Sequence, residues 1–265
     1  MASPTEFLIS FFRNPNIWGI LVAIIFGIVW LICFWPPMLK KPWHWAVLVA
    51  GAFLTLIAIS YIQIPLQSII GKGMLRLWGE EALMRSLLLS GIPTILISGL
   101  VQEGAKLVPV AVYWWRKNMK IDYKLGLTLG AAAGAGFGIL EAQWIHNAVF
   151  ASGWSWDLTY MKGLEALLPF IERFFVVAFH VGASALAGYG VATGKGWQFY
   201  LIASVLHTLV NYGVIFVQAK VFTVNEVEAL IAIVAIIVVA VALWLRWRKT
   251  GNSQPAIPGK KHIQK

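Results

Sequence analysis

Long runs of hydrophobic residues, separated by short polar segments, make up most of the chain. A helix that crosses a bilayer needs about 20 predominantly apolar residues. Seven runs approach or exceed this length: about Ile17–Trp35, His44–Ile62, Met84–Trp115, Leu125–Phe150, Pro169–Ala192, Trp197–Val217 and Val227–Leu245. The pattern predicts an all-α, polytopic transmembrane helical bundle of about seven spans. It also predicts a single domain over residues 1–249, with a polar core at about residues 95–217.

Two segments depart from this regular pattern. Met84–Trp115 is too long for one straight crossing, so we expect Pro93 either to kink it or to separate a short entry segment from the span proper, at about Ile95–Trp115. Pro65–Glu81 is amphipathic and is expected to form an interfacial helix or a re-entrant loop. At the end of the chain, Thr250–Lys265 is polar and predicts a disordered cytoplasmic tail.

Composition excludes a soluble protein. Of the 265 residues, 59% are hydrophobic and only 12% are charged, which leaves too little polar surface to face water. The net charge of +10 then indicates basic loops that orient the chain in the lipid bilayer, and we expect no nucleic-acid partner.

The basic residues are distributed unevenly between the two ends of the predicted spans. Thirteen of the 21 lysines and arginines fall on one side and six on the other, while Lys106 and Arg173 lie within spans. Basic residues favour the cytoplasmic side of a membrane. We therefore expect the N-terminus outside and the C-terminus in the cytoplasm.

Polar side chains inside four of the predicted spans do not suit a lipid-facing role. Such groups are costly in a membrane, so they usually face the bundle interior and often serve function. The third span contributes Gln102, Glu103 and Lys106, the fourth Glu141, the fifth Arg173 and His180, and the sixth His207 and Asn211. The first, second and seventh spans contribute no acidic or basic side chain to their cores and are interpreted as lipid-facing packing helices.

The spacing of these residues predicts that they meet. Residues three or four apart share one face of a helix, which applies to Glu103 with Lys106 and to His207 with Asn211. His180 lies about eleven residues into its span from the outer side, and His207 about ten residues into its span from the inner side. These depths agree, so we expect one shared polar site in the outer half of the membrane.

Glycine recurs every four residues in the fourth span, at Gly130, Gly134 and Gly138. A stripe of small residues lets a neighbouring helix approach closely. Glu141 follows the last of these glycines by three residues, so it is expected to border the same close contact.

Two histidines and two carboxylates in one buried site suit the activation of water. A carboxylate or a histidine takes the proton, and other polar groups stabilise the oxyanion of a tetrahedral intermediate. Glu103, His180 and His207 would also suit a zinc ion with one open position, although the HExxH pattern does not occur. The absence of a GxSxG motif and of a Ser–Lys pair disfavours a serine hydrolase.

Four short motifs occur in order, each on its own predicted helix: Gln102-Glu103-x-x-Lys106, Phe137-x-x-x-Glu141, Arg173 with His180, and His207-x-x-x-Asn211. Together they resemble the PrsW family of intramembrane proteases, which is related to the CAAX prenyl endopeptidases and the bacteriocin-processing enzymes. The resemblance covers about Ser98–Gly213, less than half of the chain. It implies an integral, multi-pass protein of a prokaryotic cytoplasmic membrane that cleaves membrane-anchored proteins or peptides.

The resemblance also implies roles for the residues of the site. In the better-understood relatives a glutamate and a histidine activate water, while a histidine and an asparagine hold the oxyanion. Carried across by motif, Glu103 or Glu141 would act with His180 on the water, and His207 with Asn211 would hold the oxyanion.

Gln102 departs from the family pattern, which usually has two adjacent glutamates in the first motif. A glutamine cannot take a proton at neutral pH, so the base would have to be Glu103 or Glu141. Lys106 and Arg173 are expected to be counter-ions that keep these carboxylates ionised despite burial.

Three functional hypotheses follow. The first is an intramembrane endopeptidase of glutamic or metallo type, with zinc as the candidate metal. The second, motivated by Gln102, is a family member that binds membrane proteins without cutting them. The third is a proton-coupled carrier or channel, which is disfavoured because the polar motifs do not repeat between the two halves of the chain.

Overall fold

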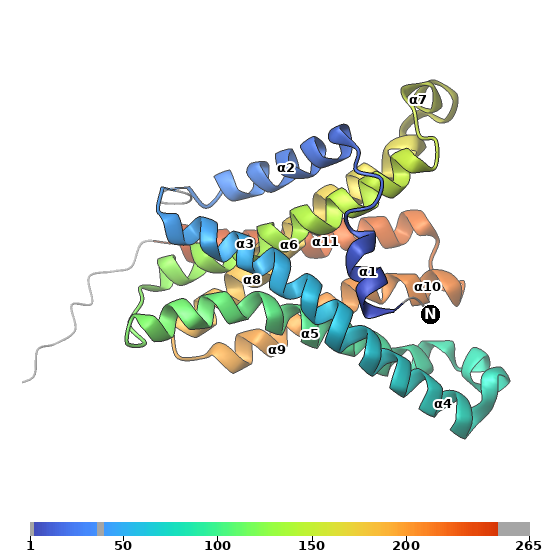
Figure 1. Cartoon of the computed structure of the whole chain (residues 1–265), viewed down its shortest axis with the longest axis horizontal. Helices are drawn as coiled ribbons and strands as arrows, with labels where there is room; N and C mark the ends of the chain where they lie inside the picture. Colours follow the sequence, from blue (N-terminus) through green and yellow to red (C-terminus); the bar gives the residue numbers. More distant parts are fainter. Residues whose placement is uncertain (1–2, 36–39, 249–265) are drawn as a thin grey trace, which may run out of the picture.

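The computed structural model describes residues 3–35 and 40–248, and these residues form helices and loops without β-strands (Figure 1). The helices are α1 (Pro4–Ser10), α2 (Ile17–Ile32), α3 (Pro42–Ala58), the π-helical turn η1 (Ile59–Gln63), α4 (Ile64–Arg85), α5 (Leu87–Arg116), α6 (Tyr123–Ala151), α7 (Trp156–Lys162), the 3₁₀ turn η2 (Gly163–Leu167), α8 (Leu168–Ala192), α9 (Gly196–Asn211), α10 (Gly213–Gln218) and α11 (Val224–Trp247). The predicted all-α architecture is confirmed, and the predicted disordered tail lies outside the described residues.

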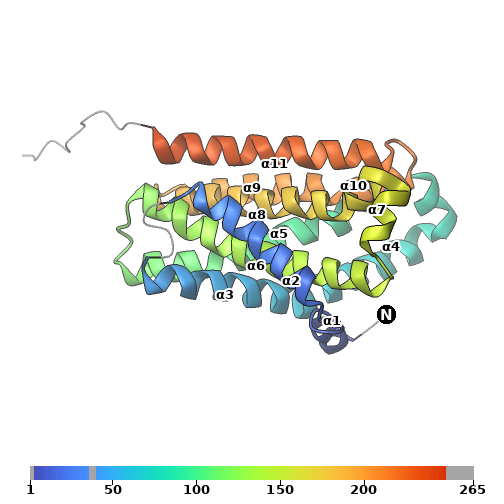
Figure 2. The same cartoon turned by 90° about the horizontal axis from the view of Figure 1, so that it is seen from above.

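The number of spans agrees with the hydrophobic pattern. Six helical stretches of the described chain are long and apolar enough to cross a membrane, and α2 is a shorter apolar helix of 16 residues. At 1.5 Å per residue α2 is roughly 24 Å long, somewhat less than a hydrocarbon core of about 30 Å. In Figure 2, α3 and α11 lie on opposite sides of the bundle, and α6 and α8 lie between them.

Glycines set the distance between the two central helices, α6 and α8. A Cβ atom added at Gly130 would lie 2.0 Å from the carbonyl oxygen of Ser184, and one added at Gly134 would lie 2.0 Å from that of His180. Gly136 makes an equally close contact on the opposite face of α6, against α3. The close approach expected from the glycine stripe is therefore present, and it brings the backbone of His180 against α6.

The second predicted span continues well beyond the length of one crossing. Together α3, η1 and α4 form a helical stretch of 44 residues, Pro42–Arg85. It is kinked at Gly79, where φ is 73° and ψ is 163°. The part before the kink, residues 42–78, is roughly 55 Å long, well beyond a hydrocarbon core of about 30 Å. No residue of α4 is buried, and the helix extends away from the bundle in Figure 1. The segment Pro65–Glu81 is helical as expected, but it continues α3 through the π-helical turn.

The third predicted span is one helix. α5 runs from Leu87 to Arg116 with Pro93 and Pro109 inside it, so Pro93 does not divide it into two segments. Pro93 lies in the second turn, near the N-terminal end of α5, where it removes one backbone hydrogen bond without interrupting the helix.

Apolar side chains cover much of the outer surface of the bundle. On α11, for example, Ile233, Ile236 and Ile237 are 52–56% exposed. Exposed aliphatic surface on a long apolar helix suits contact with lipid. The buried polar side chains lie on the opposite, inward faces of the helices.

Candidate active site

The polar residues of α5 are turned into the bundle. Gln102, Glu103 and Lys106 are each no more than 5% exposed. The Lys106 Nζ lies 2.5 Å from the Glu103 Oε1, an ion pair between residues three apart on one helix. The pairing that the spacing predicts is therefore present, at a depth where neither charge meets solvent.

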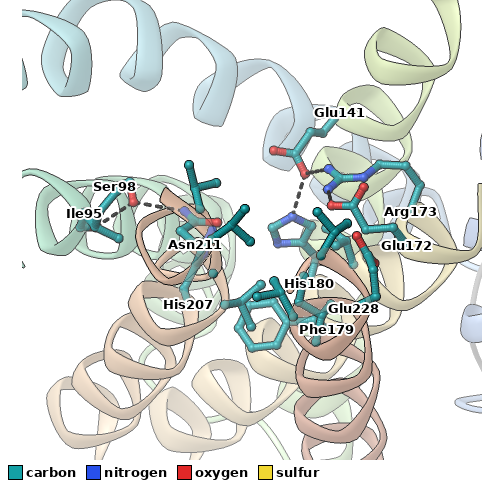
Figure 3. A pocket seen from close by; sticks show the side chains of 18 of the residues that line it. Ile95, Ser98, Glu141, Glu172, Arg173, Phe179, His180, His207, Asn211 and Glu228 are labelled. Atoms are coloured by element: carbon teal, nitrogen blue, oxygen red, sulfur yellow. Dashed lines mark hydrogen bonds and ion pairs between the residues drawn. The ribbon is translucent and has the colours of Figure 1, made fainter. Parts of the chain in front are cut away.

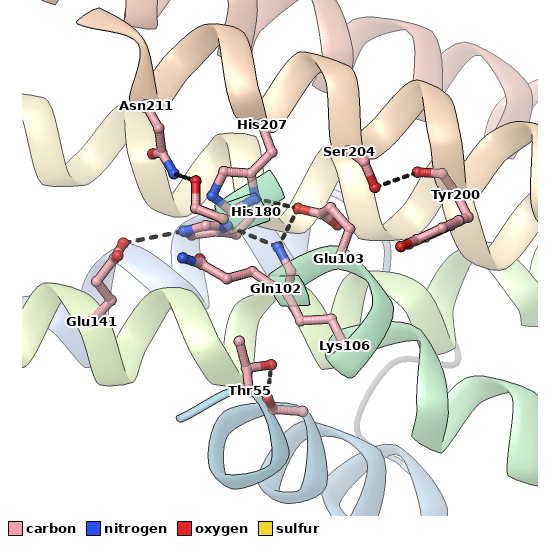
Figure 4. A network of polar contacts seen from close by, with 12 residues as sticks. Thr55, Gln102, Glu103, Lys106, Glu141, His180, Tyr200, Ser204, His207 and Asn211 are labelled. Atoms are coloured by element: carbon pink, nitrogen blue, oxygen red, sulfur yellow. Dashed lines mark hydrogen bonds and ion pairs between the residues drawn. The ribbon is translucent and has the colours of Figure 1, made fainter. Parts of the chain in front are cut away.

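Two histidines from α8 and α9 meet this ion pair (Figure 4). The Nδ1 of His207 lies 2.6 Å from the Glu103 Oε1, and the Nδ1 of His180 lies 3.0 Å from the Lys106 Nζ. The centroids of the two imidazole rings are 5.1 Å apart. The side chains of three helices therefore form one continuous network.

Glu141 of α6 extends this network to a fourth helix. Its Oε2 lies 3.1 Å from the Nε2 of His180 and 3.3 Å from the Nη1 of Arg173. The other terminal nitrogen of Arg173, Nη2, donates to Glu172. The side chain of Glu141 is 22% exposed, whereas that of Glu103 is 1% exposed. Of the two carboxylates proposed as the base, only Glu141 reaches open space.

That space is a cavity of about 610 Å³ beside the two histidines (Figure 3). Its polar lining side chains are Gln63, Gln67, Ser98, Glu141, Glu172, Arg173, His180, His207, Asn211, Gln218 and Glu228. Apolar side chains of α5, α8, α9, α10 and α11 line the rest of the cavity. Within the described chain, Glu103 and Lys106 lie behind this lining and not in it.

Asn211 also reaches the cavity, one turn of α9 beyond His207. Its Nδ2 donates a hydrogen bond to the Oγ of Ser98 in α5, at 2.9 Å. The structure thus brings together Glu103, Glu141, His180, His207 and Asn211, and places four of the five on the cavity.

Gln102 does not line the cavity itself but contacts a residue that does. Its Nε2 donates a hydrogen bond to the Oε1 of Gln63 in η1, at 3.0 Å. Gln102 is 5% exposed and links α5 to the junction between α3 and α4. The residue that departs from the family pattern therefore makes a helix–helix contact in this chain.

Six polar residues of the cavity are not among those that the sequence pattern predicts: Gln63, Gln67, Ser98, Glu172, Gln218 and Glu228. Glu228 lies in the second turn of α11, which begins at Val224, three residues before the predicted start of that span. The interpretation of the seventh span as a lipid-facing packing helix is therefore wrong at the end nearest the cavity, where Glu228 lies within the predicted span. Gln63 and Gln67 could have been inferred from the sequence, because they are four residues apart and directly follow an apolar run.

The partners of the two histidines fix where their protons lie. The ammonium of Lys106 can only donate, so the Nδ1 of His180 accepts, and the neutral ring of His180 carries its proton on Nε2, directed at Glu141. The carboxylate of Glu103 can only accept, so His207 carries its proton on Nδ1. No described residue bonds the Nε2 of His207, so in the neutral ring this nitrogen is an acceptor without a partner, on a residue that lines the cavity.

Comparison with known families agrees with this site. The family model described as PrsW family intramembrane metalloprotease matches residues 40–244. The chain belongs to the PrsW family. No curated protein and no solved structure matches it. The match runs from α3 into the last turns of α11 and includes every candidate site residue, so this PrsW-family chain is an integral, multi-pass membrane protein with an intramembrane protease domain.

The family description implies a metal ion, and the PrsW-family chain has a candidate set of donors. Glu103, His180 and His207 each offer one ligand atom, and these three atoms lie within 4.8 Å of one another. Two histidines with one glutamate are a ligand set that suits zinc. The ammonium of Lys106, however, bridges the Glu103 Oε1 and the His180 Nδ1. An ion about 2 Å from both of those atoms would take this same position and would be repelled by the ammonium. As arranged here, Lys106 engages the Glu103 Oε1 and the His180 Nδ1, so these two atoms do not suit a shared zinc ion.

Proposed function

We propose that this chain hydrolyses peptide bonds of membrane-anchored proteins without a bound metal ion, using water in the cavity beside His180 and His207. One observation carries the proposal: His207 bonds to Glu103 through Nδ1, which leaves its Nε2 without a partner in the described chain, and His207 lines the cavity. A histidine held this way by a buried carboxylate is the arrangement that activates nucleophiles in hydrolases.

In the proposed reaction, His207 is the general base. Its Nε2 takes a proton from water, and the resulting hydroxide forms a bond to the carbonyl carbon of the peptide. The carboxylate of Glu103, 2.6 Å from Nδ1, stabilises the imidazolium. His207 then gives the proton to the leaving nitrogen as the C–N bond breaks, which yields a carboxylic acid and an amine.

The oxyanion of the tetrahedral intermediate needs hydrogen-bond donors. Asn211 offers at the cavity the second N–H of its amide, beyond the one that it donates to Ser98. The Nε2–H of His180 donates to Glu141 here, so it would join Asn211 by exchanging this carboxylate for the oxyanion. Glu141 and Arg173 hold His180 in place from the other side. This assignment exchanges the roles that the family resemblance implies for the two histidines.

The proposed substrates are single-span or membrane-anchored proteins and peptides. A site enclosed by helices with lipid-facing outer surfaces is reached from the membrane or from its border. The proposed location is a prokaryotic cytoplasmic membrane, as the family resemblance implies.

The test is cleavage of a single-span substrate by the purified protein in liposomes, with products identified by mass. We expect His207→Gln and Glu103→Gln to lower kcat by about a thousandfold or more, as loss of the base or of its orienting carboxylate does in related chemistry. Glu141→Gln should cause a smaller loss, because the amide can still accept the hydrogen bond from His180. Gln198→Met, on α9 outside the cavity lining, is the matched control.

Two results would contradict the proposal. Abolished cleavage in Glu141→Gln with retained cleavage in Glu103→Gln would move the base to Glu141. Retained cleavage in both variants would exclude a Glu/His site altogether.

A further inference from the structure

One side of the cavity carries neutral hydrogen-bonding side chains, of which only Asn211 has a role in the proposed hydrolysis. Ser98 and Asn211 lie across from Glu141 and Arg173 in Figure 3. Gln67 belongs to the same side, because its Nε2 donates to the carbonyl oxygen of Thr94, one turn before Ser98 in α5. We call Gln63, Gln67, Ser98 and Asn211 the neutral wall.

The glutamines of the neutral wall form a directional chain of side-chain amides. Gln102 donates to Gln63 at 3.0 Å, Gln63 donates to Gln67 at 3.5 Å, and Gln67 donates to the Thr94 carbonyl at 2.7 Å. A primary amide has two N–H donors, and its oxygen has two lone pairs. Gln63 and Gln67 therefore each retain one N–H and one lone pair beyond these internal bonds.

A peptide backbone is the ligand that such a wall suits. The wall offers donors and acceptors together and no formal charge, which matches a chain of alternating N–H and C=O groups and suits neither an anion nor a metal cation. The charged lining residues Glu141, Glu172, Arg173 and Glu228 all come from α6, α8 and α11. The neutral wall comes from η1, α4, α5 and α9.

A membrane-anchored substrate creates the need for such pairing. A transmembrane helix satisfies its own backbone groups internally, and groups released in an apolar setting are costly unless they find partners. Attack on a peptide carbonyl requires that the helix open at the scissile bond, because the helical carbonyl is engaged and shielded by its neighbours. The opened segment then presents unpaired N–H and C=O groups to the cavity.

We infer that the neutral wall hydrogen-bonds the backbone of a locally unwound segment of the substrate, with Gln67 as a principal contact. The inference rests on the proposed function, since it names how that site holds its substrate. Gln67 is a positioning residue: it touches the backbone beside the scissile bond and takes no proton.

The experiment is a double-mutant cycle between the wall and the substrate backbone. Single-span substrates are synthesised with one backbone amide at a time replaced by an ester, which removes one N–H, at the positions flanking the scissile bond. Each is cleaved by the natural protein, by Gln67→Met and by the control Gln198→Met. We expect one ester to lower kcat/KM by about five- to tenfold with the natural protein and with the control, but by less than about twofold with Gln67→Met.

Equal ester effects in all three proteins would overturn the inference and would leave Gln67 as a residue that only holds α4 against α5. Gln67→Ser provides a second variant if Gln67→Met does not fold.

A binding measurement separates this inference from the proposed function. The same ester series is titrated against His207→Gln, with and without Gln67→Met, and affinity is read by fluorescence. Coupling in binding without cleavage by the natural protein would support the wall and contradict the protease assignment. Cleavage by the natural protein with no coupling between Gln67 and the substrate esters, in either rate or affinity, would support the protease assignment and contradict the inference about the wall.

Discussion

At the scale of single residues, Lys106 holds the site together, because its ammonium contacts both Glu103 and His180. We expect Lys106→Met to lower the free energy of unfolding by about 3–5 kcal/mol, since it leaves the carboxylate of Glu103 buried without its cation. The measurement is reversible unfolding in detergent micelles.

The double variant Lys106→Met with Glu103→Gln is the control for that prediction. It removes both charges, so it should recover part of the stability lost in Lys106→Met alone. A double variant that is less stable than either single variant would contradict the interpretation that the charges of Lys106 and Glu103 compensate each other.

A second prediction at this scale concerns Gln102. Gln102→Glu should give no gain in cleavage, because the side chain at position 102 bonds to Gln63 and does not itself line the cavity. The new carboxylate would take a hydrogen bond from Gln63 after a flip of that amide, at the expense of the Gln67 contact. The measurement is the initial rate of cleavage of one substrate by the natural protein and by Gln102→Glu. Cleavage by the variant alone would favour the hypothesis that the natural protein binds membrane proteins without cutting them.

A third prediction concerns metal. Chelators should leave cleavage unchanged, and elemental analysis should find no stoichiometric zinc in the purified protein, because Lys106 occupies the position between the donors. Lys106→Ala is the informative comparison. It frees Glu103, His180 and His207 as a donor set of the type zinc prefers, so this variant should gain zinc.

The sequence predicts which residues form the site better than it predicts how their side chains are oriented. Helical spacing alone predicts the Glu103–Lys106 pair and the common face of His207 and Asn211. It cannot tell which carboxylate faces open space, because that depends on how α5 and α6 are rotated against α8 and α9. Gln63 and Gln67 are missed for the same reason, since their direction is set by η1 and by packing on α5.

At the scale of elements, the contact between α6 and α8 is the tightest constraint on the site. Gly134→Ala would place a Cβ atom 2.0 Å from the carbonyl oxygen of His180, so the helices must separate. We expect a loss of about 1–3 kcal/mol in the free energy of unfolding, together with a loss of cleavage. Thermal unfolding and initial rates measure the two effects.

Gly73→Ala is the matched control, because nothing lies within 4 Å of a Cβ atom added at Gly73 in α4. The same change there should be neutral or slightly stabilising, since alanine favours a helix over glycine. Equal destabilisation by the two substitutions would mean that backbone flexibility, and not the close approach at Gly134, is the cause.

Element boundaries were predictable where the hydrophobic runs are long. The predicted starts and ends of α6, α8 and α11 lie within three residues of those observed. The continuation of α3 into α4 was not predictable, because the hydrophobic run ends near η1 while the backbone remains helical into the charged segment beyond it.

At the scale of the whole molecule, the distribution of basic residues still predicts an outer N-terminus and a cytoplasmic C-terminus. Cysteine labelling checks this after Cys33, the single cysteine, is replaced by alanine. A cysteine at Thr5 or Ser155 should react with an impermeant reagent added to intact cells, and one at Lys117 should react only after lysis. Labelling of Lys117→Cys in intact cells would invert the proposed orientation.

The residues of the site come from four helices that are synthesised and inserted into the membrane one after another. Glu103 and Lys106 enter with α5, Glu141 with α6, His180 with α8, and His207 only with α9. On the proposed mechanism, a nascent chain that has inserted everything up to α8 still has no base. Hydrolytic competence therefore arises late, once nearly the whole bundle is in the membrane, and a chain truncated before α9 cannot damage the proteins beside which it is being made.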